Sequence, residues 1–178
     1  MTIEKTIITL DRSKPFRLHP FLTTEYGEFS ILSQNSLAEK ITSFDLESDV
    51  LLKDFSGRKL ISALELRNNV EKNGYIPLDI YCMEAIWKNR DLVKLMKKKW
   101  WQGIHTPRLE TINFLGTILT TPGQRPEHVV TFWYDQTVFD HLNPQIMPYE
   151  ASDQAWGEKD PVAVFNPRSK TILNQLSK

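Results

Sequence analysis

The chain has 178 residues, of which 40% are apolar and 25% are charged, and its 22 basic and 22 acidic side chains cancel. This length suits a single domain, residues 1–178, with its own core, and the apolar share is too high for a disordered chain. No apolar run approaches the roughly 20 residues that cross a bilayer, and the first ten residues lack the apolar stretch of a signal peptide. These features exclude a generally basic protein and predict a soluble, cytoplasmic one.

The first third of the chain carries weak and irregular signals. We predict a short strand within Thr2–Leu10 and a second at Glu28–Leu32. A polar turn at Ser33–Ser36 is then followed by a strand at Ile41–Leu46. Residues 1–35 are interpreted as a possible N-terminal extension to a core formed by residues 36–178.

Two stop signals and two caps define helices in the middle of the chain. Ser62 with Glu65 three residues later has the spacing of a capping box, and Asn73–Gly74 predicts the end of that helix. Asp79 is the expected cap of the next helix. Asn89–Asp91 interrupts it, and a further amphipathic helix runs to Gly103. The expected core face of this last helix consists of Leu92, Val93, Leu95, Met96 and Trp100.

After Thr106–Pro107 the composition changes to β-branched and aromatic residues. Glu110–Thr120 and His128–Tyr134 predict a β-hairpin, and Asn143–Ser152, which contains two prolines, predicts a loop. A short strand at Val162–Phe165 and a closing helix at Ser169–Leu176 follow. The order of elements predicts an α+β fold, in which an antiparallel sheet containing this hairpin packs against two or three helices from the middle of the chain.

The region from Phe44 to Phe165 carries a recurrent order of aromatic and turn positions. Its pieces are Asn73-Gly74-Tyr75-Ile76, Leu78-Asp79 with Trp87 and Asn89, Asn113-Phe114-Leu115-Gly116-Thr117-Ile118-Leu119, Phe132-Trp133-Tyr134-Asp135, Trp156 and Asp160-Pro161-Val162-Ala163-Val164-Phe165. This pattern resembles a family of short uncharacterised bacterial proteins. The resemblance implies a compact bacterial domain, and it brings no activity and no functional residue with it.

A basic cluster in the third predicted helix is one candidate binding site. On a helical wheel Arg90, Lys94, Lys97, Lys98 and Trp101 share one arc. Cations beside an aromatic ring could neutralise phosphates and stack on a base or contact an anionic surface. The same pattern is typical of the solvated side of an amphipathic helix, and we favour that interpretation.

The aromatic second strand of the hairpin is the other candidate. Alternation places Val129, Thr131 and Trp133 on one face of the strand and Val130, Phe132 and Tyr134 on the other. Large side chains on both faces indicate a central strand that is covered on both sides, which we favour. An aromatic face open to a peptide or small ligand is the alternative, with Trp133 as its binding residue.

Catalytic and metal motifs are scarce. The four histidines are far apart, and the best remaining set is His128, Asp135, Asp140 and His141. Cys82 lies in an apolar helical context, which favours a buried, inert thiol over a nucleophile. The sequence lacks the GxxxxGK[ST], GxGxxG and GxSxG patterns. We therefore predict no cofactor and no metal site.

By elimination, the leading hypothesis is a non-catalytic protein-interaction module. Its partner would be another protein, contacted by the aromatic sheet face or by the Lys94–Trp101 region. The first alternative is binding of nucleic acid or an anionic surface through the basic helix 88–101. The second is a hydrolase-like enzyme with a His/Asp site in the C-terminal half.

Overall fold

The computed structural model describes residues 7–13, 29–53, 55, 62–103, 111–121, 127–135, 141–149 and 161–178, and for parts of the later helices and strands it describes the backbone alone. The strands are β1 (Ile7–Thr9), β2 (Ser30–Gln34), β3 (Ser43–Asp45), β4 (Val50–Lys53), β5 (Ile76–Pro77), β6 (Thr111–Thr120), β7 (Glu127–Asp135), β8 (His141–Tyr149) and β9 (Val162–Phe165). The helices are α2 (Ser36–Lys40), α3 (Leu46–Asp49), α4 (Ala63–Lys72), α5 (Ile80–Trp87), α6 (Arg90–Gly103) and α7 (Lys170–Leu176).

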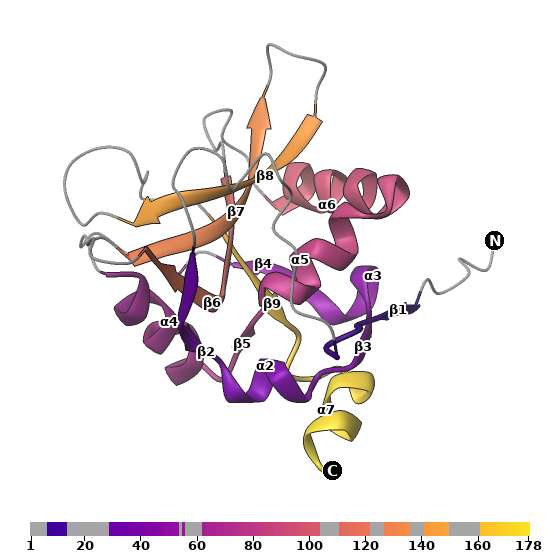
Figure 1. Ribbon diagram of the computed structural model, residues 1–178. Helices are drawn as coiled ribbons and strands as arrows, with labels where there is room; N and C mark the ends of the chain where they lie inside the picture. Colours follow the sequence, from indigo (N-terminus) through magenta and orange to yellow (C-terminus); the bar gives the residue numbers. More distant parts are fainter. Residues whose placement is uncertain are drawn as a thin grey trace.

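A seven-stranded sheet forms the centre of the domain (Figure 1). Its main path runs β4-β9-β6-β7-β8, while β2 pairs with β6 and β5 pairs with β9. Neighbouring strands are antiparallel except β6 and β9, which are parallel at Asn113 and Val162. Separately, β1 pairs with β3. Helices and strands alternate over much of the chain, but the strand pairs are almost all antiparallel, and the predicted α+β class is confirmed.

Both faces of the sheet carry buried apolar side chains. On one face Phe114 and Phe132 pack with the inner residues of α5 and α6, and the Trp87 ring lies 6.5 Å from that of Phe132. On the other face Leu115 and Val129 pack with residues of α4. The hairpin β6–β7 is therefore a layer between two sets of helices, as its apolar residues on both faces indicated.

The predicted helix boundaries agree closely with the structure. Ser62 and Glu65 form the capping box of α4, and the helix is followed by Gly74, whose φ of +77° is the left-handed conformation that glycine adopts readily. Asp79 caps α5. The Asn89 side chain accepts hydrogen bonds from the first amides of α6, which separates the two helices where the sequence placed the break.

One predicted loop is wrong. Residues 143–149 of the predicted loop Asn143–Ser152 belong to β8, which pairs with β7 along its whole length. Pro144 lies opposite Phe132 and Pro148 lies opposite His128. The strand is the last in the sheet order, and a proline is tolerated there because its missing N–H can face away from the neighbouring strand.

The polar turn predicted at Ser33–Ser36 is also wrong, because these residues end β2 and begin α2. Asn35 caps α2 by accepting a hydrogen bond from the Ala38 amide. The strand predicted at Ile41–Leu46 is shorter, since Asp45 caps α3. Helices of four or five residues have too little periodicity to be read from sequence, and here their caps define them.

The described segments within the first 35 residues pack against the rest of the domain. Ile8 and Leu10 are buried in the larger apolar cluster, and β2 is hydrogen-bonded to β6. At the other end of the chain, α7 is attached through Gln175, whose side-chain oxygen accepts bonds from the amides of Thr42 and Ser43. Both ends of the described chain therefore pack against the segment that contains α2 and β3.

Candidate functional site

The basic residues predicted as a binding face lie on α6. Lys94 and Lys98 are exposed, one turn apart, while Leu92 and Met96 are buried on the core side of the helix. Lys94 Nζ lies 3.2 Å from Asp91 Oδ1, so part of the basic charge is offset locally. The side chains of Arg90, Lys97 and Trp101 lie outside the described part of the structure. The amphipathic helix is confirmed, and its role in binding stays a prediction.

The aromatic side chains of the sheet that the structure describes belong to the core. The rings of Phe114, Phe132 and Phe165 are fully buried, and the first two meet edge to face with their centroids 5.1 Å apart. Trp133 lies on β7 opposite Thr111 and Asn143, and its side chain lies outside the described part. These three rings are therefore covered, as we favoured from the sequence, and they present no exposed surface to a ligand.

The strand register divides the histidine and aspartate set proposed from the sequence. Asp135 lies opposite His141 where β7 and β8 meet, while His128 lies opposite Pro148. His128 and Asp135 are seven positions apart on one strand, which is about 23 Å of extended chain. Asp140 lies outside the described residues. The register separates His128 from Asp135 and His141, and the described residues contain no group of three potential metal ligands.

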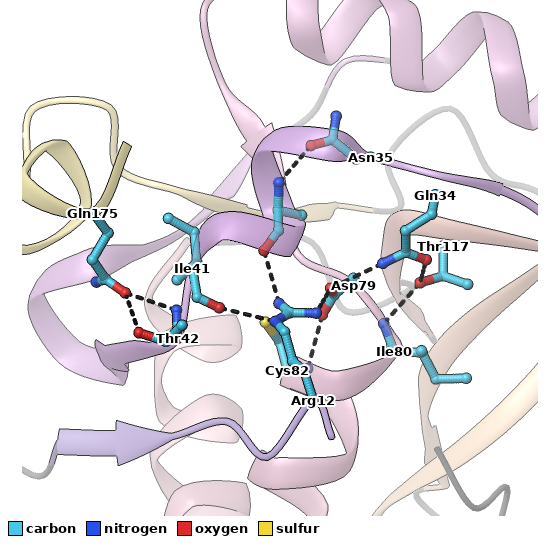
Figure 2. A network of polar contacts seen from close by, with 11 residues as sticks. Arg12, Gln34, Asn35, Ile41, Thr42, Asp79, Ile80, Cys82, Thr117 and Gln175 are labelled. Atoms are coloured by element: carbon cyan, nitrogen blue, oxygen red, sulfur yellow. Dashed lines mark hydrogen bonds and ion pairs between the residues drawn. The ribbon is translucent and has the colours of Figure 1, made fainter. Parts of the chain in front are cut away.

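A buried ion pair joins the N-terminal segment to the start of α5 (Figure 2). Arg12 Nη1 lies 2.6 Å from Asp79 Oδ2, and the Asp79 side chain is fully buried. The same guanidinium donates from Nε to the Ile41 carbonyl at 3.0 Å and from Nη2 to the Ala38 carbonyl at 2.7 Å. It therefore connects the last turn of α2 with the first turn of α5.

Asp79 also accepts hydrogen bonds from two other parts of the fold. Its Oδ1 accepts from the Cys82 amide at 3.0 Å, and its Oδ2 accepts from Gln34 Nε2 at 3.0 Å. The Thr117 hydroxyl donates to Gln34 Oε1 at 2.6 Å and accepts from the Ile80 amide at 3.2 Å. Each named carboxylate oxygen is bonded within the protein. This network is a structural junction between β2, β6, α5 and the N-terminal segment.

The carboxylates of Asp45 and Asp49 are buried in a similar way. Asp49 Oδ1 accepts from the Ser169 hydroxyl at 2.5 Å and its Oδ2 accepts from the Asp45 amide at 2.7 Å. Asp45 Oδ1 accepts from two amides of α3. These aspartates use their oxygens to fix a helix start and the connection to α7, so they have the bonding of structural residues.

Cys82 lies beside this junction and is fully buried. Burial raises the pKa of its thiol well above the ordinary value, and the neighbouring negative charge of Asp79 raises it further. The thiol is therefore neutral in the folded protein, as its apolar sequence context indicated, and it lacks the thiolate character of a nucleophile.

Cys82 gives a test of this environment. We expect no reaction with a disulfide reagent such as DTNB at pH 8 in the folded protein and complete reaction in denaturant. Above about pH 8.5 the unfolded chain loses the thiol proton that the folded chain keeps, so the stability falls as the pH rises. Cys82→Ala is expected to remove that part of the alkaline loss, measured by urea denaturation at pH 8 and pH 10. Rapid labelling of the folded protein would contradict this assignment.

Strand β2 presents a different kind of surface. Its neighbouring side chains Ile31 and Leu32 are 45% and 48% exposed. The strand bonds to β6 with a register irregularity between Ile31 and Ser33, and its sequence, SILSQ, contains no charge. The next residue, Ser33, is hydrogen-bonded to α4, because its hydroxyl oxygen accepts a hydrogen bond from Arg67 Nη2 at 2.7 Å. The sequence indicated a strand here but carried no signal that β6 would be its one partner among the described residues.

Comparisons with known protein families, with curated proteins and with solved structures give no match. The functional argument therefore depends on the geometry of the chain itself.

Proposed function

We propose that this domain is a non-catalytic protein-interaction module that binds an extended segment of another protein along β2. The observation that carries the proposal is the exposure of two neighbouring large apolar side chains, Ile31 and Leu32, on a strand that pairs with β6 alone among the described residues. An edge strand offers main-chain donors and acceptors to an added strand, and apolar side chains beside them offer contact area.

The composition of β2 supports this interpretation. Proteins usually protect a sheet edge against pairing with lysine, proline or inward-pointing charges, and Ser30–Gln34 contains none of these. The register irregularity between Ile31 and Ser33 is a protective feature of the strand. The expected partner segment is extended, has no charge opposite β2, and places an apolar side chain against Ile31 or Leu32.

The second candidate is binding of an anionic partner through α6. It is favoured by the exposure of Lys94 and Lys98 on successive turns of the helix. The ion pair between Lys94 and Asp91 reduces the free positive charge of that surface. We therefore rank it below the β2 proposal and include it as one arm of the same experiment.

The test places a photo-crosslinking amino acid at Leu32, Leu173 or Lys98, one position at a time, in the native host. Leu173 on α7 is 49% exposed and is the matched control for Leu32. We expect a discrete protein adduct from position 32 and none from position 173. A synthetic peptide covering the crosslinked segment is then expected to slow hydrogen exchange of the β2 amides, and Leu32→Lys is expected to weaken its binding by tenfold or more.

Other outcomes contradict the proposal in different ways. The same adducts from positions 32 and 173 would show non-specific contact. A protein or nucleic-acid adduct from position 98 alone would favour α6 as the binding surface. Peptide binding without protection of the β2 amides would exclude strand addition.

A further inference from the structure

The guanidinium of Arg12 lies in a cradle built by four residues. Figure 2 shows it between Ile41, whose carbonyl accepts from Nε at 3.0 Å, and Asp79, whose Oδ2 lies 2.6 Å from Nη1. The Ala38 carbonyl accepts from Nη2 at 2.7 Å. The Tyr81 ring faces the same group, with its centroid 5.1 Å from Arg12 Cζ. We call this set of residues the guanidinium cradle (Ala38, Ile41, Asp79, Tyr81).

The cradle matches the shape of a guanidinium. A guanidinium carries its N–H donors on three nitrogens in one plane, and here each nitrogen has an acceptor of its own. The ammonium group of a lysine has one nitrogen, so it cannot occupy these three positions at once. An aromatic ring within about 6 Å adds attraction for a flat cation. The geometry is therefore specific for an arginine side chain.

The cradle belongs to elements other than the segment of its occupant. Ala38 lies on α2, and Ile41 caps the end of that helix. Asp79 caps α5 through its bond to the Cys82 amide. These three cradle residues are fully buried, whereas 17% of the Arg12 side chain is exposed. The space that holds the guanidinium is thus defined by its occupant, and it reaches solvent along the Arg12 side chain.

The segment that carries Arg12 docks in the manner of a bound peptide. Strand β1 pairs with β3 alone among the described residues, and beyond it the Leu10 amide donates to the Thr42 carbonyl at 2.8 Å. Ile8 and Leu10 are buried, while the residues between and beside them are exposed. Arg12 follows at the same spacing of two. Main-chain bonds to one strand and inserted alternate side chains are the features of recognition by strand addition.

We infer that the guanidinium cradle is a binding site for an arginine side chain, which the chain's own Arg12 fills. The N-terminal segment is then an internal ligand of the domain, recognised by the pattern of Ile8, Leu10 and Arg12. An arginine from another chain has access to the site only where Arg12 has left it. A buried ion pair adds little stability compared with apolar packing, but it selects the group that fits. This site is independent of the proposed binding along β2.

The experiment uses the full chain with Arg12→Ala and NMR titration with ethylguanidinium. This molecule supplies the atoms that the substitution removes beyond Cβ. We expect saturable shifts of the Ile41 and Cys82 amides, and a urea midpoint that rises with the ligand concentration. The wild type, whose site is filled, is expected to show neither. Ethylammonium at the same ionic strength is expected to bind about tenfold more weakly, because it has one nitrogen.

Two further variants locate the binding. Adding Asp79→Asn to Arg12→Ala removes the counter-charge, and we expect about tenfold weaker binding of ethylguanidinium. Arg67→Ala alone is the matched control, because the Arg67 side chain is only 10% exposed. Its Nη2 donates to the Ser33 hydroxyl, but its Nε lies 3.5 Å from the exposed carboxylate of Glu71. This counter-charge is in water, so we expect binding about tenfold weaker than in Arg12→Ala.

Three results would overturn the inference. The first is the absence of saturable shifts in Arg12→Ala up to the highest ethylguanidinium concentration that leaves the wild type folded. The second is equal binding to the wild type or to Arg67→Ala. The third is an affinity that Asp79→Asn leaves unchanged. If Arg12→Ala does not fold in buffer, the titration is repeated in trimethylamine N-oxide, which favours the folded state. A chain that ethylguanidinium neither shifts nor refolds there would also contradict the site.

Discussion

Replacing Asp79 with alanine is expected to lower the free energy of unfolding by about 3–5 kcal/mol, the range for breaking a buried ion pair. The change removes the cap of α5, the partner of Arg12 and the acceptor of the Gln34 amide at once. Arg12 would keep its bonds to two carbonyls but lose its counter-charge. Urea denaturation followed by circular dichroism measures the loss.

The contributions of the cap and the charge can be separated. Asp79→Asn keeps an oxygen that accepts from the Cys82 amide but removes the negative charge, so we expect a loss smaller than that of Asp79→Ala. Asp91→Ala is the control, because the ion pair between Asp91 and Lys94 is almost fully exposed and such pairs contribute little. Equal effects of Asp79→Ala and Asp91→Ala would show that the junction does not stabilise the fold.

Replacing Gly116 with alanine is expected to destabilise the protein by about 3 kcal/mol or more. A Cβ at this position would lie 2.7 Å from the Pro77 carbonyl oxygen and 2.8 Å from the Asp79 Cα. These are backbone atoms, and Gly116 is held close to them because its amide donates to the Leu78 carbonyl at 2.8 Å. The clash cannot be relieved without moving β6 away from the start of α5.

Gly74→Ala is the informative comparison in the same denaturation experiment. No atom lies within 4 Å of a Cβ at this position, but its φ of +77° disfavours a side chain. We expect a loss of about 1–2 kcal/mol from backbone strain alone. If Gly116→Ala were no more destabilising than Gly74→Ala, the close approach between β6 and α5 would not be rigid.

Local signals predicted much of the fold because they act over a few residues. The capping box at Ser62 and Glu65 and the glycine at Gly74 define α4 through bonds and dihedral angles that involve neighbouring residues only. The hairpin β6–β7 followed from β-branched and aromatic composition on both sides of a turn. The loop predicted over Asn143–Ser152 failed because the effect of a proline depends on whether its strand is at the edge of a sheet, which is a property of the tertiary structure.

The candidate sites likewise divide into features that local sequence signals predicted and features that depend on tertiary contacts. The sequence alone determined that α6 is amphipathic and that Cys82 lies among apolar residues, and both follow from local periodicity. It gave no reason to join Arg12 with Asp79, because that ion pair connects residues far apart along the chain. Tertiary structure also decided which polar residues lose contact with water. The sequence does not distinguish Thr111, Asn113 and Thr131 from other strand residues. Only the strand pairing shows that they lie side by side, where they are buried. Periodicity reports which face a side chain occupies, whereas burial depends on what packs against that face.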